Sequence, residues 1–376
     1  MINPAQFYEL LQTKELTMFT GVPDSTLKQL CAYITDHVPP ERNIITANEG
    51  NAIGLASGYY LSTNNPAIVY MQNSGLGNCV NPLTSLTDED VYSIPMLLII
   101  GIWGWRGEPG KKDEPQHVRM GQITLEMLDV LKIPYSIIPD TIEETEIEVS
   151  KAVVHMNNHK TPYALVVRKG TFTEHKLQNT KTTNYPLNRE QAIRTLVPLL
   201  EEDAIIVSTT GKTSRELFEF REELQQGHER DFLTVGSMGH SSSITLGVAL
   251  QKPKKKVYCF DGDGALIMHM GALSTIGQLQ PKNLCHIVLN NFAHDSVGGQ
   301  PTAADNIDIP QVAQANGYKK VFSAQSEEEI RAKIKEIQQL EGPTLLEIKV
   351  NKGARKELGR PTTTPKENKS ELMKYL

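Results

Sequence analysis

Cysteine is scarce in this chain. Only 4 of the 376 residues are cysteine, and they show neither C-x-x-C spacing nor clustering. This distribution argues against a disulfide scaffold and against a structural zinc site, because both need closely grouped cysteines. We expect four reduced thiols, as in a cytoplasmic protein.

Long apolar runs and basic runs are also missing. The longest apolar stretch, residues 95–105, is too short to span a bilayer, and the first residues carry no basic-then-apolar signal pattern. The net charge is −6, so the composition gives no support for binding to nucleic acid or to anionic membranes. The sequence therefore predicts a soluble cytoplasmic protein with neither a nucleic-acid nor a membrane partner.

The chain does contain short apolar, β-rich runs that alternate regularly with helical patterns. Such alternation predicts parallel sheets covered by helices on both faces, and 376 residues are enough for two such domains. A polar segment at 171–188 separates two series of runs and is predicted to be a linker, with Asn188 capping the next helix. We expect an α/β fold of two doubly wound parallel-sheet domains, at 1–170 and 189–376, with no central domain and a polar C-terminal tail. Strands are expected at 16–20, 43–47, 66–72, 96–102, 135–138, 163–167, 204–208, 232–235, 256–260, 286–289 and 344–349.

An acidic glycine turn followed by an amide pair carries the first chemical signal. The turn D-G-D-G at 261–264 follows one apolar strand, and N-N at 290–291 follows the next. Oxygen ligands at the ends of neighbouring strands suit Mg²⁺, which usually shares its coordination sphere with phosphate. The glycines let backbone N–H groups approach that phosphate at the start of a helix. The sequence therefore predicts a magnesium-held diphosphate, with Asp263 and Asn291 as side-chain ligands.

This pattern resembles the diphosphate-binding motif of thiamine diphosphate (ThDP) enzymes. The family often has glycine directly after the amide pair, where this chain has Phe292. The resemblance implies that the Ala293 carbonyl is a third Mg²⁺ ligand, beside Asp263 and Asn291. It also implies that the turn contacts the cofactor through Gly262, Asp263, Gly264 and Ala265.

A second candidate lies in the first half, where Glu49 follows a predicted strand and opens a helix of small residues. In ThDP enzymes a buried carboxyl that is hydrogen-bonded to the aminopyrimidine ring activates the cofactor. A carboxyl in apolar surroundings can share its proton in this way. The alternative is an acid that only satisfies the helix dipole. Together with the downstream turn, Glu49 is the strongest catalytic candidate.

The segment G-S-M-G-H at 236–240 resembles the part of these enzymes that passes under the bent centre of the cofactor. There the Gly236 carbonyl would accept a hydrogen bond from the aminopyrimidine, beside Ser237, and Met238 would wedge the two rings apart. Alternatively, Met238 only fills the core, which is common for methionine.

Several motifs together resemble one small family, the two-domain ThDP-dependent decarboxylases of phosphonopyruvate and sulfopyruvate. The motifs are E-G-N-A-I-G at 49–54, Q-N-S-G-L-G-N at 72–78, G-S-M-G-H at 236–240 and the turn with its amide pair. The resemblance implies decarboxylation of the 2-keto acid 3-phosphonopyruvate to phosphonoacetaldehyde and CO₂, with ThDP and Mg²⁺, in phosphonate biosynthesis. It also implies self-association with the active site at a subunit interface. Sulfopyruvate decarboxylation, or a related ThDP synthase reaction, is the alternative.

The terminal oxyanion of such a substrate requires cations or hydrogen-bond donors, and Arg and Lys are suited to bind it. A charged segment follows a buried strand, so it is expected at the sheet edge where α/β folds bind ligands. Asp24 is the candidate for a proton relay, and His294 is a candidate acid or base because histidine titrates near neutrality. The candidates for substrate contact are Ser25, Asn73, Arg106, Lys112, His117, Arg119 and Arg360.

Three competing interpretations have less support. An EF-hand would need a polar residue and a glycine at positions 265 and 266, where alanine and leucine stand. G-K-T-S at 211–214 lacks the earlier glycine of a P-loop, since Ile206 occupies that position. A non-enzymatic scaffold of the same fold is the third alternative, and the intact Glu49, Asp263 and Asn291 argue against it.

Overall fold

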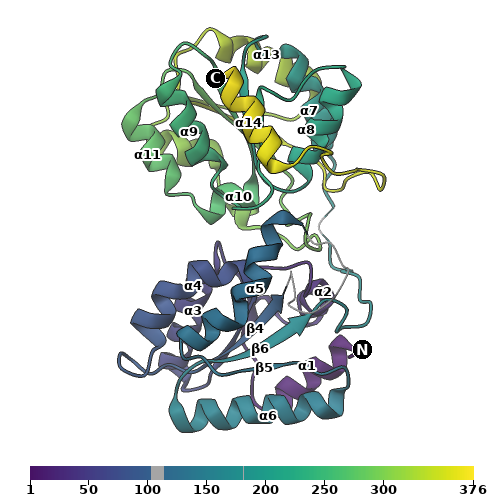
Figure 1. Cartoon of the computed structure of the whole chain (residues 1–376), viewed down its shortest axis with the longest axis vertical. Coiled ribbons are helices and arrows are strands. Elements are labelled where there is room, and N and C mark those ends of the chain that lie inside the picture. Colours follow the sequence, from purple (N-terminus) through teal and green to yellow (C-terminus); the bar gives the residue numbers. More distant parts are fainter. Residues whose placement is uncertain (103–113, 181) are drawn as a thin grey trace. The chain divides into compact units, whose positions relative to one another are not determined.

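The computed structural model describes residues 1–102, 114–180 and 182–376, which form two compact units (Figure 1). The first unit comprises Met1–Thr180 with Val297–Pro301, and the second comprises Lys181–Ser296 with Thr302–Leu376. The change from one unit to the other at residues 180 and 181 falls within the segment 171–188 that was predicted as the linker.

The first unit is built on a six-stranded parallel sheet. Its strand order is β2-β1-β3-β4-β6-β5. The strands are β1 (Phe19–Gly21), β2 (Asn43–Ile45), β3 (Ala67–Gln72), β4 (Met96–Ile102), β5 (Tyr135–Ile137) and β6 (Tyr163–Arg168).

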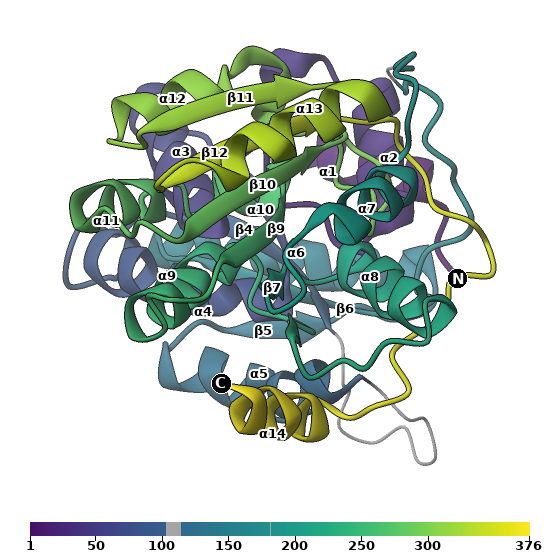
Figure 2. The same ribbon diagram turned by 90° about the horizontal axis from the view of Figure 1, so that it is seen from above.

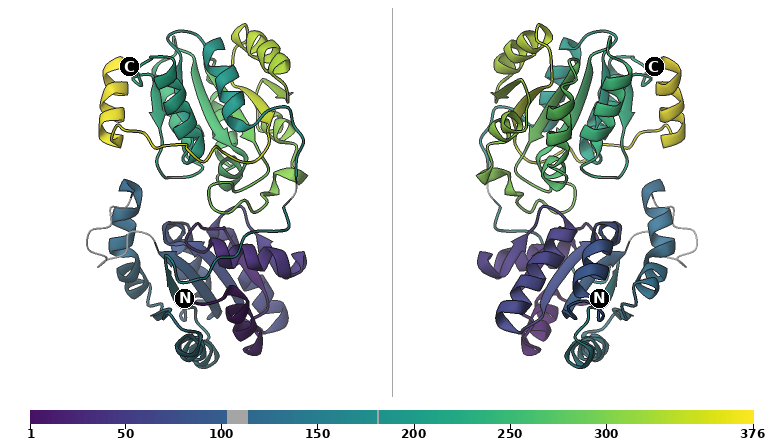
Figure 3. Two further views of the ribbon diagram at one scale, coloured as in Figure 1. Left: turned by 90° about the vertical axis from the view of Figure 1, so that its right-hand side faces the viewer. Right: turned by 90° about the vertical axis from the view of Figure 1, so that its left-hand side faces the viewer.

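Helices cover both faces of this sheet, as the side views in Figure 3 show. All seven residues of β4 are buried, and they alternate between two apolar clusters: Leu97 and Ile99 belong to one, Leu98 and Ile100 to the other. Because successive strand residues point to opposite faces, each face has its own core. The helices are α1 (Pro4–Thr13), α2 (Lys28–His37), α3 (Glu49–Thr63), α4 (Leu76–Pro82), α5 (Pro115–Val130) and α6 (Ile142–His159), with short turns η1 (Pro40–Arg42), η2 (Asn73–Gly75) and η3 (Leu83–Thr87).

The second unit repeats this architecture. Its six parallel strands run in the order β11-β12-β10-β9-β7-β8, and Figure 2 shows most of them side by side. The sequence did not predict β11, an edge strand whose residues are mostly half-exposed or exposed. The strands are β7 (Ile205–Ser208), β8 (Asp231–Leu233), β9 (Val257–Gly262), β10 (Leu284–Asn290), β11 (Lys320–Ala324) and β12 (Thr344–Lys349).

Helices also flank the second sheet. The helix α7 begins with the predicted cap, since Asn188 and Gln191 form a capping box. The polar tail contains a helix that was not predicted, α14 (Pro365–Tyr375), whose Asn368 accepts a hydrogen bond from the Leu233 N–H of β8 at 3.1 Å. The helices are α7 (Arg189–Leu196), α8 (Lys212–Glu223), α9 (Ser241–Gln251), α10 (Asp263–Met268), α11 (Ala272–Leu279), α12 (Ile309–Ala315), α13 (Glu327–Gln338) and α14, with η4 (Val197–Leu199) and η5 (Ala303–Asn306).

The predicted fold class, two doubly wound parallel-sheet domains, is therefore confirmed. The segment between β6 and α7 is tied to each unit in turn. Asp36 accepts hydrogen bonds from the Gln178 and Asn179 N–H groups in the first unit, and Asn351 accepts one from the Tyr185 N–H in the second.

Among the described residues, no helix combines the length and apolarity that a membrane crossing would require.

Candidate functional site

Strand register places the two predicted metal ligands at one edge of the second sheet. The strands β9 and β10 are parallel neighbours, with Gly262 opposite Leu289. Asp263 directly follows β9, and Asn291 directly follows β10. Because the carboxyl ends of parallel strands meet at the same edge, both side chains belong to one polar site.

Asp263 has the environment of a metal-binding carboxylate. It is buried, and its Oδ2 accepts a hydrogen bond from the Thr302 hydroxyl at 2.5 Å. Desolvation raises the pKa of Asp263 to about 6, although hydrogen bonds from Thr302 and from nearby backbone groups lower it. Within the described part of the chain, no lysine, arginine or histidine forms an ion pair with this carboxylate. A buried anion without a protein counter-charge is stabilised when a cation binds, so the site fits Mg²⁺.

The loop after β10 places the other predicted ligands. The Asn291 side-chain oxygen accepts a hydrogen bond from the Ala293 N–H at 3.1 Å. The Ala293 carbonyl accepts one from the Asp295 N–H at 2.9 Å, which leaves its second lone pair for a metal. The two members of the amide pair therefore differ, because Asn290 instead donates to Glu347 at 2.7 Å inside the sheet.

Phe292, the departure from the family pattern, adopts the conformation that glycine would favour. Its φ is 59°, in the left-handed region that is costly for a bulky side chain. Its ring stacks on Tyr185 at 6.0 Å between centroids. The stacking offsets part of the backbone strain at Phe292.

The turn at 236–240 lies against the acidic turn within the second unit. Gly239 has a φ of +85°, and a Cβ there would lie 2.9 Å from the Ala265 carbonyl oxygen. Ser237 is exposed and Met238 is half-buried. The structure thus brings the predicted cofactor-binding segments around Met238 and Ala265 together. It adds His269, which the sequence did not predict and whose ring lies 4.4 Å from that of His240.

His294 packs directly on the acidic turn. A Cβ at Gly264 would lie 3.1 Å from the His294 Cε1, so the glycine permits this close approach. Burial lowers the pKa of His294 to about 4. Its imidazole is therefore neutral near pH 7, where it can accept a proton but has none to donate from an imidazolium.

In the first unit, Glu49 is buried at the start of α3. Its Oε2 accepts a hydrogen bond from the Asn78 side chain at 2.7 Å. A Cβ at Gly75 would lie 2.6 Å from the Glu49 Oε1, so the glycine of η2 makes room for the carboxyl. The neutral amide of Asn78 orients the carboxyl without supplying a compensating charge.

Asp24, Ser25 and Asn73 follow β1 and β3, whose carboxyl ends lie at the same edge of the first sheet. Asp24 is fully buried and accepts hydrogen bonds from the Thr26 N–H at 2.5 Å and from Gln72 at 3.4 Å. Asn73 is also fully buried and donates to the Thr124 hydroxyl at 2.9 Å, and Ser25 is half-buried. The first sheet edge thus gathers the Asp24 carboxylate, the Gln72 and Asn73 amides and the Ser25 hydroxyl.

The remaining substrate candidates belong to both units. His117 is half-buried and Arg119 exposed in the first turns of α5, and Arg360 is exposed between β12 and α14. Arg106 and Lys112 lie outside the described residues. The predicted cluster of basic side chains is therefore represented by His117 and Arg119 alone in the described part of the first unit.

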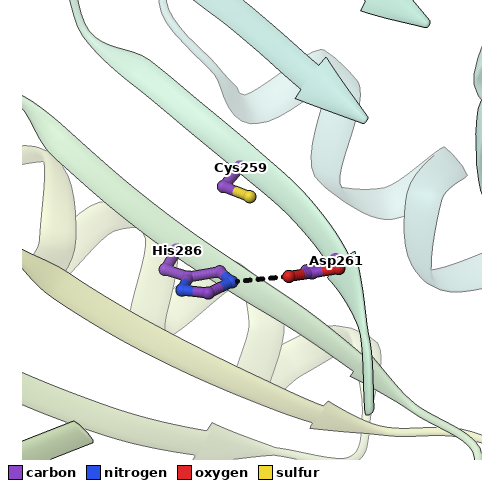
Figure 4. Close-up of side chains that lie close together, drawn as sticks. All are labelled: Cys259, Asp261 and His286. Carbon is purple, nitrogen blue, oxygen red and sulfur yellow. Dashed lines mark hydrogen bonds and ion pairs between the residues drawn. The ribbon is translucent and has the colours of Figure 1, made fainter. Parts of the chain in front are cut away.

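Another group of potential ligands, Cys259, Asp261 and His286, lies inside the second sheet (Figure 4). The His286 ring is hydrogen-bonded to Asp261 and to the Tyr318 hydroxyl, each at 3.2 Å. Asp261 also accepts from the Gly262 N–H at 3.0 Å. These hydrogen bonds satisfy the polar groups of the cluster, which therefore stabilises the end of β9, where the acidic turn begins.

The sequence reasoning missed one polar partner of a candidate residue in each unit. Asn78 holds Glu49, and Thr302 holds Asp263. Asn78 stands in the Q-N-S-G-L-G-N motif at 72–78, so a signal for it was present, but neither residue was given a role.

Comparison with known proteins agrees with this geometry. Models of thiamine pyrophosphate enzymes match the chain twice: the N-terminal TPP binding domain at residues 5–120 and the C-terminal TPP binding domain at 209–348. Phosphonopyruvate decarboxylase of Streptomyces viridochromogenes is 36% identical, over 98% of this chain and 93% of that protein. The enzyme of the same name from Streptomyces hygroscopicus is 33% identical, over 98% and 92%. Sulfopyruvate decarboxylase of Methanosarcina acetivorans is 28% identical, over 87% and 86%.

The chain therefore belongs to the thiamine diphosphate-dependent decarboxylases, in the family that includes the phosphonopyruvate decarboxylases. It is a carboxy-lyase whose cofactor is thiamine diphosphate.

Proposed function

We propose that this enzyme decarboxylates 3-phosphonopyruvate to phosphonoacetaldehyde and CO₂, with ThDP and Mg²⁺, as a step of phosphonate biosynthesis in the cytoplasm. The observation that carries the proposal is the likeness to two phosphonopyruvate decarboxylases over 98% of the chain, combined with the buried Asp263 at the end of β9. In this reaction the bond between the carboxylate and the keto carbon breaks, and a proton takes the place of CO₂. The cofactor accepts the electron pair that this cleavage releases.

The protein's own groups hold the metal and the cofactor, and they transfer protons. We propose that Asp263, Asn291 and the Ala293 carbonyl hold Mg²⁺, and that Gly262, Gly264 and Ala265 line the diphosphate. The buried Glu49 carboxyl exchanges a proton with the pyrimidine ring, and Asn78 keeps this carboxyl in place.

The turn at 236–240 is proposed to contact the two cofactor rings. The Gly236 carbonyl and Ser237 offer polar contacts, and Met238 offers an apolar one. Gly239 of this turn lies close to Ala265 of the acidic turn, which supports the assignment because one ligand can then touch both turns.

Substrate contacts are proposed for polar and cationic groups at the sheet edges. Asp24 relays a proton, and His294 is the second candidate acid or base, with an imidazole that burial keeps neutral at pH 7. Guanidinium groups bind a phosphonate through paired hydrogen bonds. The proposed substrate contacts are Ser25, Asn73, Arg106, Lys112, His117, Arg119 and Arg360.

Self-association is the second part of the proposal. The α3 helix that carries Glu49 has open space beside Gly54 and Gly58, and its Leu61 is 73% exposed. Small residues allow close helix packing, so we propose that another copy of the chain packs there and that the active site forms at the subunit interface. Coexpressed Glu49→Gln and Asp263→Asn chains should then recover about a quarter of native activity through mixed dimers. Two inactive chains that stay inactive together would contradict a shared site.

The substrate is tested by comparing kcat/KM for phosphonopyruvate, sulfopyruvate and pyruvate. We expect phosphonopyruvate to be preferred by at least about ten-fold, because the extra charge of the phosphonate strengthens its attraction to guanidinium groups. Sulfopyruvate is the second candidate, supported by the Methanosarcina relative. A preference for sulfopyruvate would overturn the named substrate but not the chemistry.

A further inference from the structure

A buried ionic network contacts the proposed metal-binding loop of the second unit, residues 291–296. Arg189, the first residue of α7, donates from Nε to the Glu216 Oε2 at 2.7 Å and from Nη2 to Oε1 at 2.8 Å. Its Nη1 donates to the Asp295 Oδ2 at 3.2 Å. The side chains of Arg189 and Glu216 are 6% and 0% exposed. One guanidinium therefore bridges a helix and a loop within the core.

A second cation reaches the same loop residue. Lys212, the first residue of α8, donates to the Asp295 carbonyl at 3.1 Å and lies 3.3 Å from the Asp295 Oδ2. The backbone of Gly211, just before α8, also lies close to the loop, since a Cβ at Gly211 would lie 3.0 Å from the Ser296 hydroxyl. The loop is thus attached to two helices at one point, Asp295.

Asp295 is directly connected to the proposed ligands. Its N–H donates to the Ala293 carbonyl, and the Ala293 N–H donates to the Asn291 side chain. A displacement of Asp295 would therefore move the Ala293 carbonyl and release the Asn291 amide. Groups that orient metal ligands in this way tune affinity for the metal without touching it.

We propose that Arg189, Lys212 and Glu216 are positioning residues that hold Asp295, and through it Ala293 and Asn291, in the arrangement that binds Mg²⁺ and the ThDP diphosphate. The inference rests on the proposed function of this loop. The network would then contribute to metal and cofactor binding as well as to the stability of the fold. Buried ion pairs are weak evidence for stability, because desolvation offsets much of their attraction.

The chain contains a matched control for this claim. Arg221 makes the same bidentate contact with Asp231, at 2.8 and 2.9 Å, with side chains that are 6% and 0% exposed. Its further hydrogen bond goes to Gln226, away from the loop at 291–296. Arg189→Met and Arg221→Met therefore remove pairs of equal geometry and burial, and only one of them holds the loop.

The test is calorimetric titration of ThDP at saturating MgCl₂, and of MgCl₂ at saturating ThDP, into the full chain and its variants. We expect Asp295→Asn, Lys212→Gln and Arg189→Met to raise both dissociation constants by about 10- to 100-fold. Arg221→Met should lower the thermal midpoint of the cofactor-free chain about as much as Arg189→Met does, yet keep native affinities within about two-fold. Lys212→Arg keeps the cation and should restore binding that Lys212→Gln loses.

If Asp295→Asn and Lys212→Gln bind both ligands as the native chain does, the inference is wrong. It is also wrong if Arg221→Met weakens binding as much as Arg189→Met. Should Arg189→Met fail to fold, the Asp295 and Lys212 variants decide alone. A native chain that takes up no ThDP would instead overturn the proposed function itself.

Discussion

The two units share one architecture but differ in the chemistry at the ends of their strands. Each has a six-stranded parallel sheet with polar groups at one edge. In the first unit, the carboxyl of Glu49 is held by the neutral amide of Asn78. In the second, Asp263 stands beside a loop that is fixed by two cations, Arg189 and Lys212. A carboxyl that is oriented by a neutral amide suits proton exchange with a ring, and an ionically fixed loop suits a metal site.

This difference predicts a separation of effects. Substitutions in the first unit should reduce turnover and spare cofactor uptake, whereas substitutions in the second should reduce uptake.

Glu49→Gln should have the largest effect on turnover. The amide cannot exchange a proton, so we expect kcat to fall by about 10²- to 10⁴-fold, measured as CO₂ release at saturating ThDP. Glu41→Gln, which changes an exposed carboxylate of the same unit, is the control and should be neutral. Unchanged turnover in Glu49→Gln would reject its catalytic role.

Removal of the metal should have the next largest effect. Without Mg²⁺, the buried Asp263 and the diphosphate repel each other, so we expect ThDP affinity to fall by about 100-fold in EDTA. Titration of ThDP with and without MgCl₂ measures this change, and equal affinities would show that no metal mediates binding.

Gly264→Ala should weaken ThDP binding by about ten-fold, because the added methyl would lie 3.1 Å from the His294 ring. Gly271→Ala is the matched control, since a Cβ there meets no heavy atom within 4 Å. Combining Gly264→Ala with His294→Ala relieves the contact, so the two effects should be non-additive. If the losses of ThDP affinity were additive, the contact between the added methyl and His294 would not be the cause of the effect.

The acidity of Asp263 gives a smaller, pH-dependent effect. Its pKa of about 6 lies above the ordinary value of 3.8, so the folded chain binds this proton more tightly than the unfolded chain. In the absence of Mg²⁺, stability should therefore fall as pH rises from about 4 through 6. Asp263→Asn should lose this component of the profile, which thermal unfolding at each pH would detect. A native and variant profile of the same shape would contradict the assigned pKa.

Phe292→Gly should have the smallest effect. Glycine removes the strain at φ 59° but also removes the stacking on Tyr185, and each contribution is about 1 kcal/mol. We expect the free energy of unfolding to change by less than about 1 kcal/mol, measured by denaturant titration, with ThDP affinity nearly native. A large loss of affinity would mean that the aromatic side chain itself shapes the site.

The sequence predicted two parallel-sheet units, because the alternation of strand and helix patterns is a local signal. It also predicted that Asp263 and Asn291 lie together, because each directly follows a strand. It missed β11, whose edge position gives it little apolar content. It also missed Thr302 as a partner of Asp263, because 39 residues separate them and only the folded loop joins them. The role of Asp295 was hidden for the same reason, since Arg189 lies 106 positions earlier.

Calorimetric titration of ThDP into Glu49→Gln and Asp263→Asn, side by side with MgCl₂ present, tests the central claim most directly. Glu49→Gln should take up the cofactor with nearly native affinity, and Asp263→Asn should bind it about 100-fold more weakly. Native affinity in Asp263→Asn would contradict the account.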